Sequence, residues 1–192
     1  MTNIPIVEVG WEYSDVYPCD TQFIEYLSGL GLEKMNTAVI FHMGPGLHHK
    51  VGPWAVEQSN IFVRSISITP SEVKEYINLA TENPWLARKY MVDFGDIHLI
   101  NANILPRFDF ISLFHLGEIS EQVLNPDYPG NAVEGVLNTM TKKLSVAGEI
   151  LFYEKSAAWE KIKTFVEIHL STGYNYKMTQ FKDLVIFKKE VK

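Results

Sequence analysis

Short apolar runs alternate with longer amphipathic segments along the chain. Apolar runs that are rich in β-branched and aromatic residues and end at turn-forming residues are typical of buried strands. Such runs are present at 37–43, 60–68, 89–94, 108–116 and 149–155. An apolar period of three to four residues predicts helices. This period is found at 20–35, 69–82, 132–144 and 156–173. The alternation of strands with helices indicates βαβ units and a mostly parallel sheet.

The C-terminal part of the chain departs from this alternation. Residues 174–181 and 184–189 are strand-like runs that lie too close together for a crossover helix. Lys182 and Asp183 between them predict a hairpin turn. We therefore predict an α/β three-layer sandwich, in which a mostly parallel, doubly wound sheet is closed by an antiparallel C-terminal hairpin strand.

Length and composition predict one ordinary domain. Within the 192 residues, we expect 20–192 to form the α/β core and 1–19 to form a lead-in or lid. The 17 basic and 23 acidic residues give a net charge of −6, which argues against nucleic-acid or anionic-membrane partners. Cys19 is the only cysteine, so no disulfide or CxxC motif is present. Without a signal-peptide pattern or an apolar run of about 18 residues, a cytoplasmic protein is expected.

Ligands of open α/β sheets bind beyond the carboxyl ends of the strands, so the residues that follow the strands are the site candidates. Gly44-Pro45-Gly46 directly follows the first strand, and glycines there let backbone N–H groups come close to a ligand. Histidines are also concentrated at or just past predicted strand ends. Five of the six lie there, namely His42, His48, His49, His98 and His115. We predict that at least one of them lies in a ligand pocket.

Four features, in this order, resemble the class I S-adenosylmethionine-dependent methyltransferases. They are Gly44-Pro45-Gly46 after the first strand, Gly95-Asp96 after the third, Phe108-Asp109-Phe110 opening the fourth, and residues 143–150, which look like the family's L-x-x-G-G turn. The C-terminal hairpin follows as it does in that family. The resemblance covers the order of elements over residues 20–190.

The resemblance implies S-adenosylmethionine as the cofactor. The cofactor-binding residues that it implies are His42, Gly44, Pro45, Gly46, His48, Thr69, Glu72, Asp96 and Ile97. His115 and Glu118 stand where the family often carries the residues nearest the transferred methyl group, so they are the candidate catalytic residues. His115 is the candidate base because an imidazole titrates near neutral pH. No metal ligand is assigned in this interpretation.

The methyl acceptor is expected to be a small molecule. No inserted cap domain is visible, so the acceptor would be bound by 1–19, by the loop over 117–131, or by a partner subunit such as a second copy of the chain. The residues implied for acceptor binding are Trp11, Tyr13, Tyr17 and His49. The predicted reaction is methyl transfer by positioned displacement, with a histidine as the base.

Departures from the family pattern keep other functions open. His42 stands where the pattern has an acidic residue, His48 where it has the third glycine, and Ser67-Ile68-Thr69 ends the second strand without a carboxylate. These differences are consistent with a methyltransferase-like binding or scaffold protein without methyl transfer. The strand-end histidines also suggest a metal-using enzyme, with His115 and Glu118 as a candidate ligand pair. A nicotinamide-dependent dehydrogenase is disfavoured because a full G-x-G-x-x-G motif is absent.

Overall fold

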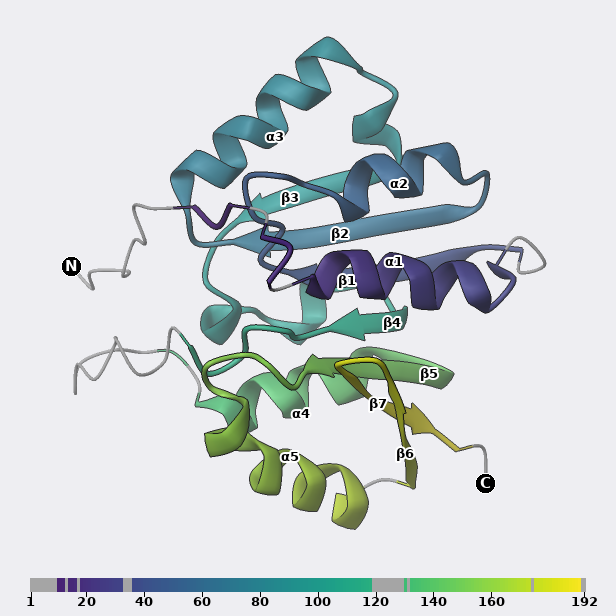
Figure 1. The fold of residues 1–192 in the computed structure, drawn as a ribbon, viewed down its shortest axis with the longest axis vertical. Coiled ribbons are helices and arrows are strands. Elements are labelled where there is room, and N and C mark those ends of the chain that lie inside the picture. The colour runs from purple at the N-terminus through teal and green to yellow at the C-terminus, as the bar shows by residue number, and fades with distance from the viewer. Residues whose placement is uncertain are drawn as a thin grey trace.

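The computed structural model of the chain describes residues 10–12, 14–16, 18–32, 36–118, 130, 132–173 and 175–190. These residues contain a seven-stranded sheet with the order β3-β2-β1-β4-β5-β7-β6 (Figure 1). The strands are β1 (Ala38–Met43), β2 (Ile61–Ser67), β3 (Tyr90–Phe94), β4 (Phe108–Ser112), β5 (Leu144–Tyr153), β6 (Tyr176–Phe181) and β7 (Leu184–Lys189). Strands β1 to β5 pair in parallel, and β7 is antiparallel to both β5 and β6. The predicted sheet is therefore confirmed.

Helices on both faces complete the three-layer sandwich (Figure 1). They are α1 (Cys19–Gly29), α2 (Val51–Glu57), α3 (Pro70–Glu82), α4 (Val133–Lys143) and α5 (Trp159–Gly173), with short 3-10 turns η2 (Leu86–Arg88), η3 (Ile97–Leu99) and η4 (Ala102–Ile104). Phe23 of α1 and Val166 of α5 belong to separate buried clusters. Strand β1 contributes Ile40 to one and Phe41 to the other, because successive strand residues face opposite sides. None of the described helices has the length and apolar character needed to cross a membrane.

Helix α2 was not predicted from the sequence. Gly52 and Pro53 interrupt its helical pattern, and the helix is short. Pro53 is tolerated because it lies in the first turn, where backbone N–H groups have no partner within the helix. Gly52 is required by packing, since a Cβ there would lie 2.2 Å from Cδ1 of the buried Tyr90.

Strand β5 begins earlier than predicted. We expected it to start at Glu149, whereas it runs from Leu144. Its pairing with β4 shifts register between Phe108 and Phe110, and Ala147 has a φ of +61°. This irregular stretch lacks the regular alternation of apolar and polar residues by which a strand is recognised in sequence.

Candidate functional site

The glycine turn (residues 44–47) follows β1 at the carboxyl edge of the sheet. The N–H of Gly44 donates to the Ile66 carbonyl at 3.0 Å. Gly44 and Gly46 have φ values of +67° and +62°, which glycine adopts without strain. A Cβ on Gly44 would meet nothing within 4 Å, whereas one on Gly46 would lie 2.7 Å from Nε2 of His48. The backbone at Gly44 therefore borders open space.

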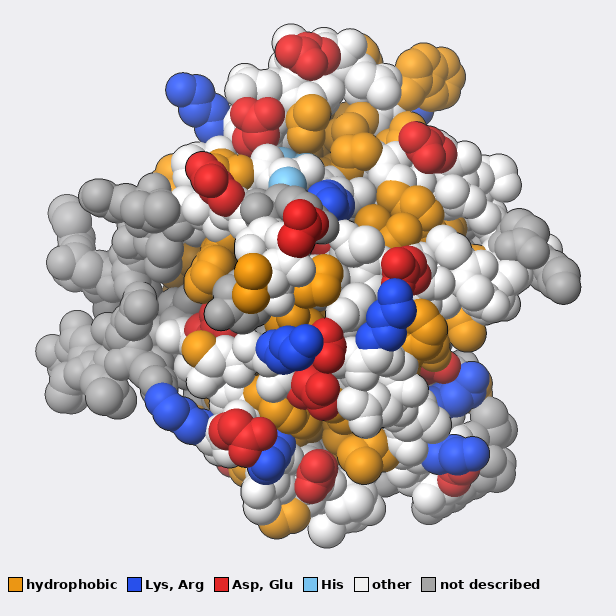
Figure 2. Space-filling view, in the orientation of Figure 1, with side chains coloured by type: hydrophobic (Ala, Val, Ile, Leu, Met, Phe, Trp, Pro, Cys, Tyr) orange, Lys and Arg blue, Asp and Glu red, His pale blue; other side chains and the backbone are white. Residues whose placement is uncertain are grey.

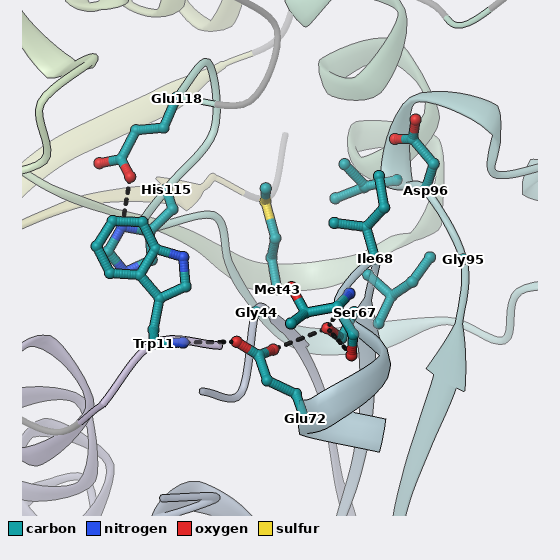
Figure 3. A pocket seen from close by; sticks show the side chains of 13 residues that line it. Trp11, Met43, Gly44, Ser67, Ile68, Glu72, Gly95, Asp96, His115 and Glu118 are labelled. Atoms are coloured by element: carbon teal, nitrogen blue, oxygen red, sulfur yellow. Dashed lines mark hydrogen bonds and ion pairs between the residues drawn. The ribbon is translucent and has the colours of Figure 1, made fainter. Parts of the chain in front are cut away.

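Two cavities lie at this edge of the sheet. The first has a volume of about 40 Å³ and is lined by residues that include Met43, Ser67, Ile68, Thr69, Glu72, Asp96 and Ile97 (Figure 3). The second has a volume of about 450 Å³ and is lined by residues that include Cys19, Asp20, Gly46, His48, Tyr153 and Ser156. Trp11, Gly44, His115 and Glu118 line both, so the two cavities meet at these residues.

Glu72 places a buried carboxylate in the wall of the first cavity. It lies in the first turn of α3. One of its oxygens accepts a hydrogen bond from Ser67 Oγ at 2.7 Å, and the other accepts the backbone N–H of Trp11 at 3.0 Å (Figure 3). The Trp11 carbonyl accepts the N–H of Leu47 at 2.7 Å. Trp11 therefore links α3 to the glycine turn.

Asp96 lies at the opposite side of the first cavity from Trp11 (Figure 3). It precedes η3, and its Oδ1 accepts the backbone N–H of His98 at 2.8 Å. This local cap holds the carboxylate in place just after β3, beside Gly95.

His115 and Glu118 follow β4 and form a hydrogen-bonded pair where the cavities meet (Figure 3). His115 Nδ1 lies 3.2 Å from Glu118 Oε2, and the Trp11 ring stacks on the imidazole with centroids 5.3 Å apart. Glu118 Oε1 accepts hydrogen bonds from Ser156 Oγ at 2.6 Å and from the Ala157 N–H at 3.0 Å. Burial alone would raise the pKa of Glu118, but His115 and these donors hold the pKa below its ordinary value. The ionised carboxylate therefore accepts Nδ1–H of His115 and orients the imidazole, so that Nε2 is the ring nitrogen that Glu118 does not contact.

Asp20 is a residue of the cavity wall that the sequence analysis missed. It lies in the first turn of α1, is 4% exposed, and lines the second cavity. Its Oδ1 lies 3.6 Å from His42 Nε2, and its Oδ2 lies 3.6 Å from His48 Nδ1. Burial alone would raise the pKa of Asp20, but His42 and His48 hold the pKa below its ordinary value. Pro18 occupies the N-cap position of α1, so Asp20 lies inside the first turn of the helix.

His49 is fully buried and lines neither cavity. Its Nε2 lies 2.8 Å from the Glu72 carbonyl oxygen, which can only accept, so Nε2 carries the proton. Nδ1 of the neutral ring then accepts from the Tyr90 hydroxyl at 2.6 Å. Burial lowers the pKa of His49, which favours this neutral form. Both ring nitrogens are thus used within the protein.

The structure brings most of the predicted site residues together. Those that line a cavity are Trp11, Gly44, Gly46, His48, Thr69, Glu72, Asp96, Ile97, His115 and Glu118. His42 and Pro45 line neither cavity, and His42 is buried behind Asp20. Tyr13 and Tyr17 lie outside the described residues. Within the described part of the chain, no group of three or more His, Cys, Asp or Glu side chains is arranged to hold a metal ion.

Similar proteins are found by structure. No protein-family model and no curated protein matches the sequence. The precorrin-6y C5,15-methyltransferase of Geobacter metallireducens matches with a TM-score of 0.61 and 14% identity, over 97% of this chain and 100% of that one. A glycopeptide N-methyltransferase complexed with S-adenosylmethionine matches with a TM-score of 0.59 and 12% identity, over 90% and 94% of the two chains. The precorrin 8w decarboxylase of Methanobacterium thermoautotrophicum matches with a TM-score of 0.58 and 14% identity, over 97% of each chain.

These matches define the class of fold. The chain has the fold of the class I S-adenosylmethionine-dependent methyltransferases, as the order of its elements predicted. At 12% to 14% identity the likeness concerns the fold, and the name of one similar structure is that of a decarboxylase. Function must therefore be argued from the residues of the site.

Proposed function

We propose that the protein is an S-adenosylmethionine-dependent methyltransferase that acts on a small-molecule acceptor. The observation that carries the proposal is that two cavities meet at Trp11, Gly44, His115 and Glu118. A cofactor whose nucleoside lies in the first cavity would bring its sulfonium to this boundary. The second cavity, of about 450 Å³, would then receive the acceptor beside the amino-acid part of the cofactor, with His115 at the boundary of the two cavities.

The residues around the first cavity suit an adenosine group. Ile68 and Ile97 offer apolar surfaces to a flat ring, and Asp96 offers an acceptor for its exocyclic amine. The open backbone at Gly44 allows close approach. Although β2 ends without a carboxylate, Glu72 of α3 lies beside the end of that strand, where it could accept from ribose hydroxyls.

The first cavity, of about 40 Å³, is smaller than adenosine, so the proposed function requires Trp11 to shift. That shift would free the Glu72 oxygen that accepts the Trp11 N–H, and a ribose hydroxyl could replace it. The same contact favours the alternative of a binding or scaffold protein without methyl transfer, in which Trp11 stays on Glu72. The described residues give no support to the metal-using alternative.

Bound S-adenosylmethionine would supply a methyl group activated by its sulfonium. Nε2 of His115 would take the proton from an acceptor hydroxyl or amine as that group reacts. Glu118 would keep the imidazole in the required tautomer and stabilise the imidazolium that forms. The Trp11 ring, stacked on His115, would help to exclude water from the reacting atoms.

A small acceptor is supported by size and charge. The second cavity, of about 450 Å³, lies within the range of roughly 300–1,000 Å³ typical of small-molecule sites. The net charge is −6, and Lys and Arg side chains are scattered among acidic ones on the face shown in Figure 2, which disfavours a nucleic-acid acceptor. A cytoplasmic location and a single domain remain predictions from the sequence, as do the three alternatives for the acceptor side, namely residues 1–19, the loop over 117–131 and a partner subunit.

Calorimetric titration with S-adenosylmethionine and S-adenosylhomocysteine tests the proposal, with metal content measured on the same sample. Binding in the micromolar range, about −8 kcal/mol, is the expected result. Absence of binding to both would overturn the proposed function and leave the binding or scaffold alternative. A stoichiometric metal without cofactor binding would instead support the metal-using alternative.

The role of His115 is tested by turnover. We expect His115→Asn to reduce formation of S-adenosylhomocysteine from a panel of small phenols and amines by about 100- to 10,000-fold. Its affinity for S-adenosylhomocysteine should change little. His169→Asn, on α5 and outside both cavity linings, is the matched control. Full turnover by the His115 variant would contradict its role as the base.

A further inference from the structure

Asp20 brings a buried carboxylate to the second cavity from a helix that precedes the whole sheet. Gly44 and Gly46 of the glycine turn line the same cavity, so Asp20 faces the region just beyond the end of β1. His42, the last residue but one of β1, lies behind it at 3.6 Å. Helix α1 thus supplies a negative charge at a strand end where the strand itself carries a histidine.

The described contacts of Asp20 leave one of its oxygens without a hydrogen-bond donor. On the Oδ1 side are His42 Nε2, at 3.6 Å, and the Cys19 thiol, at 3.8 Å. On the Oδ2 side is His48 Nδ1, at 3.6 Å. That nitrogen accepts the backbone N–H of Lys50 at 3.4 Å, so a neutral His48 turns a lone pair toward Oδ2. The described residues therefore offer Oδ2 no hydrogen-bond donor.

Among the described residues, the ion-pair partners of Asp20 are both histidines, which carry a positive charge only when they are protonated. Burial lowers the pKa of His48, which favours its neutral form. Lys155 lines the cavity, but its ammonium pairs with Asp183 at 2.9 Å. Glu118, the other carboxylate near the cavity boundary, already accepts from His115, Ser156 and Ala157. Of the described carboxylates that line the second cavity, Asp20 is thus the buried one with acceptor capacity to spare.

A buried carboxylate with unused acceptor capacity is stabilised by a cation that can donate several hydrogen bonds. We propose that Asp20 binds the ammonium group of the amino-acid part of S-adenosylmethionine, an assignment that rests on the proposed function. With the nucleoside in the first cavity, the chain beyond the sulfonium would pass Gly44 into the second cavity, where Asp20 lies.

The test compares ligands with and without the amino group. Calorimetry on the wild-type protein would use S-adenosylhomocysteine, its analogue without the α-amino group, and 5′-methylthioadenosine, which lacks the whole amino-acid part. We expect loss of the amino group to weaken binding by about 10- to 100-fold, as for a hydrogen bond to a charged partner. This comparison needs no variant, so it does not depend on how a substitution folds.

Asp20→Asn supplies the other half of the comparison. It should weaken S-adenosylhomocysteine binding by a similar factor, leave 5′-methylthioadenosine binding unchanged, and remove the preference for the amino group. Glu25→Gln is the matched control, because it removes a charge from an exposed position of the same helix. Unchanged binding of 5′-methylthioadenosine also shows that the variant is folded.

Three outcomes would overturn the assignment, and they are distinguishable. If wild-type protein binds none of the nucleosides, the proposed function fails and the assignment fails with it. If it binds S-adenosylhomocysteine but Asp20→Asn binds equally well, only the assignment fails, and Asp20 is then free to face a cation of the acceptor. If the variant loses S-adenosylhomocysteine and 5′-methylthioadenosine equally, Asp20 has a structural role.

Discussion

Trp11 lies at the boundary where the two cavities meet. Its ring lies over His115 and borders both cavities, while its backbone is held by Glu72 and Leu47. Half of the residue is exposed, so its ring is not locked into a core. A ligand that enters the first cavity must therefore change the surroundings of the indole.

Indole fluorescence should report this change. We expect S-adenosylhomocysteine to alter the tryptophan emission of the wild-type protein and to alter it far less in Trp11→Phe. Trp85→Phe is the control, because Trp85 is exposed, stacks with Arg88 at 4.0 Å, and lines neither cavity. An undiminished signal in Trp11→Phe, with calorimetric binding intact, would show that the ligand does not reach Trp11.

At the scale of elements, α2 depends on one close contact. A Cβ on Gly52 would overlap the ring of Tyr90, which is 1% exposed. Gly52→Ala should lower the free energy of unfolding by about 1–3 kcal/mol, as overpacking of a core does. The matched substitution Gly29→Ala, at the exposed end of α1 with nothing within 4 Å, should be neutral or stabilising by up to about 1 kcal/mol. Urea denaturation of both variants checks the contrast, and equal effects would contradict it.

The same contact shows where sequence-based prediction of elements succeeds and where it fails. Buried strands and amphipathic helices were predictable because each carries its own period of apolar residues. Helix α2 carries no such period. The glycine at position 52 is required by the ring of Tyr90, which lies far along the chain in β3. The early start of β5 could not be predicted either, because it depends on a register shift in the pairing with β4.

Some site residues were likewise predictable from the sequence, whereas others were not. Gly44, Asp96 and His115 could be placed from sequence because the ends of parallel strands share one edge of the sheet. Asp20 could not be placed, since the direction it faces depends on how α1 packs against that edge. His49 lies in the right loop, yet its ring turns inward to Tyr90. Position along the chain gives the edge of the sheet but not the direction of a side chain.

At the scale of the whole molecule, the groups with shifted pKa values act together on the free energy of unfolding. The pKa values of Asp20, Glu118, His48 and His49 are all lowered in the folded protein. Each group therefore binds protons less readily in the folded state than in the unfolded chain. The unfolded state takes up more protons as the pH falls, so the free energy of unfolding must fall with it.

As the pH falls, the histidines lower the free energy of unfolding before the carboxylates do. An unfolded histidine titrates near pH 6.5, so the loss of stability should begin as the pH falls below about 7, before the carboxylates contribute near pH 4. His49→Gln should lower the free energy of unfolding at pH 7.5 by about 2 kcal/mol, because two buried hydrogen bonds are disturbed. The same variant should make the decline between pH 7.5 and 5.5 shallower, because a glutamine does not titrate. Urea denaturation across this range measures both effects, and a decline as steep as that of the wild type would show that His49 does not contribute to it.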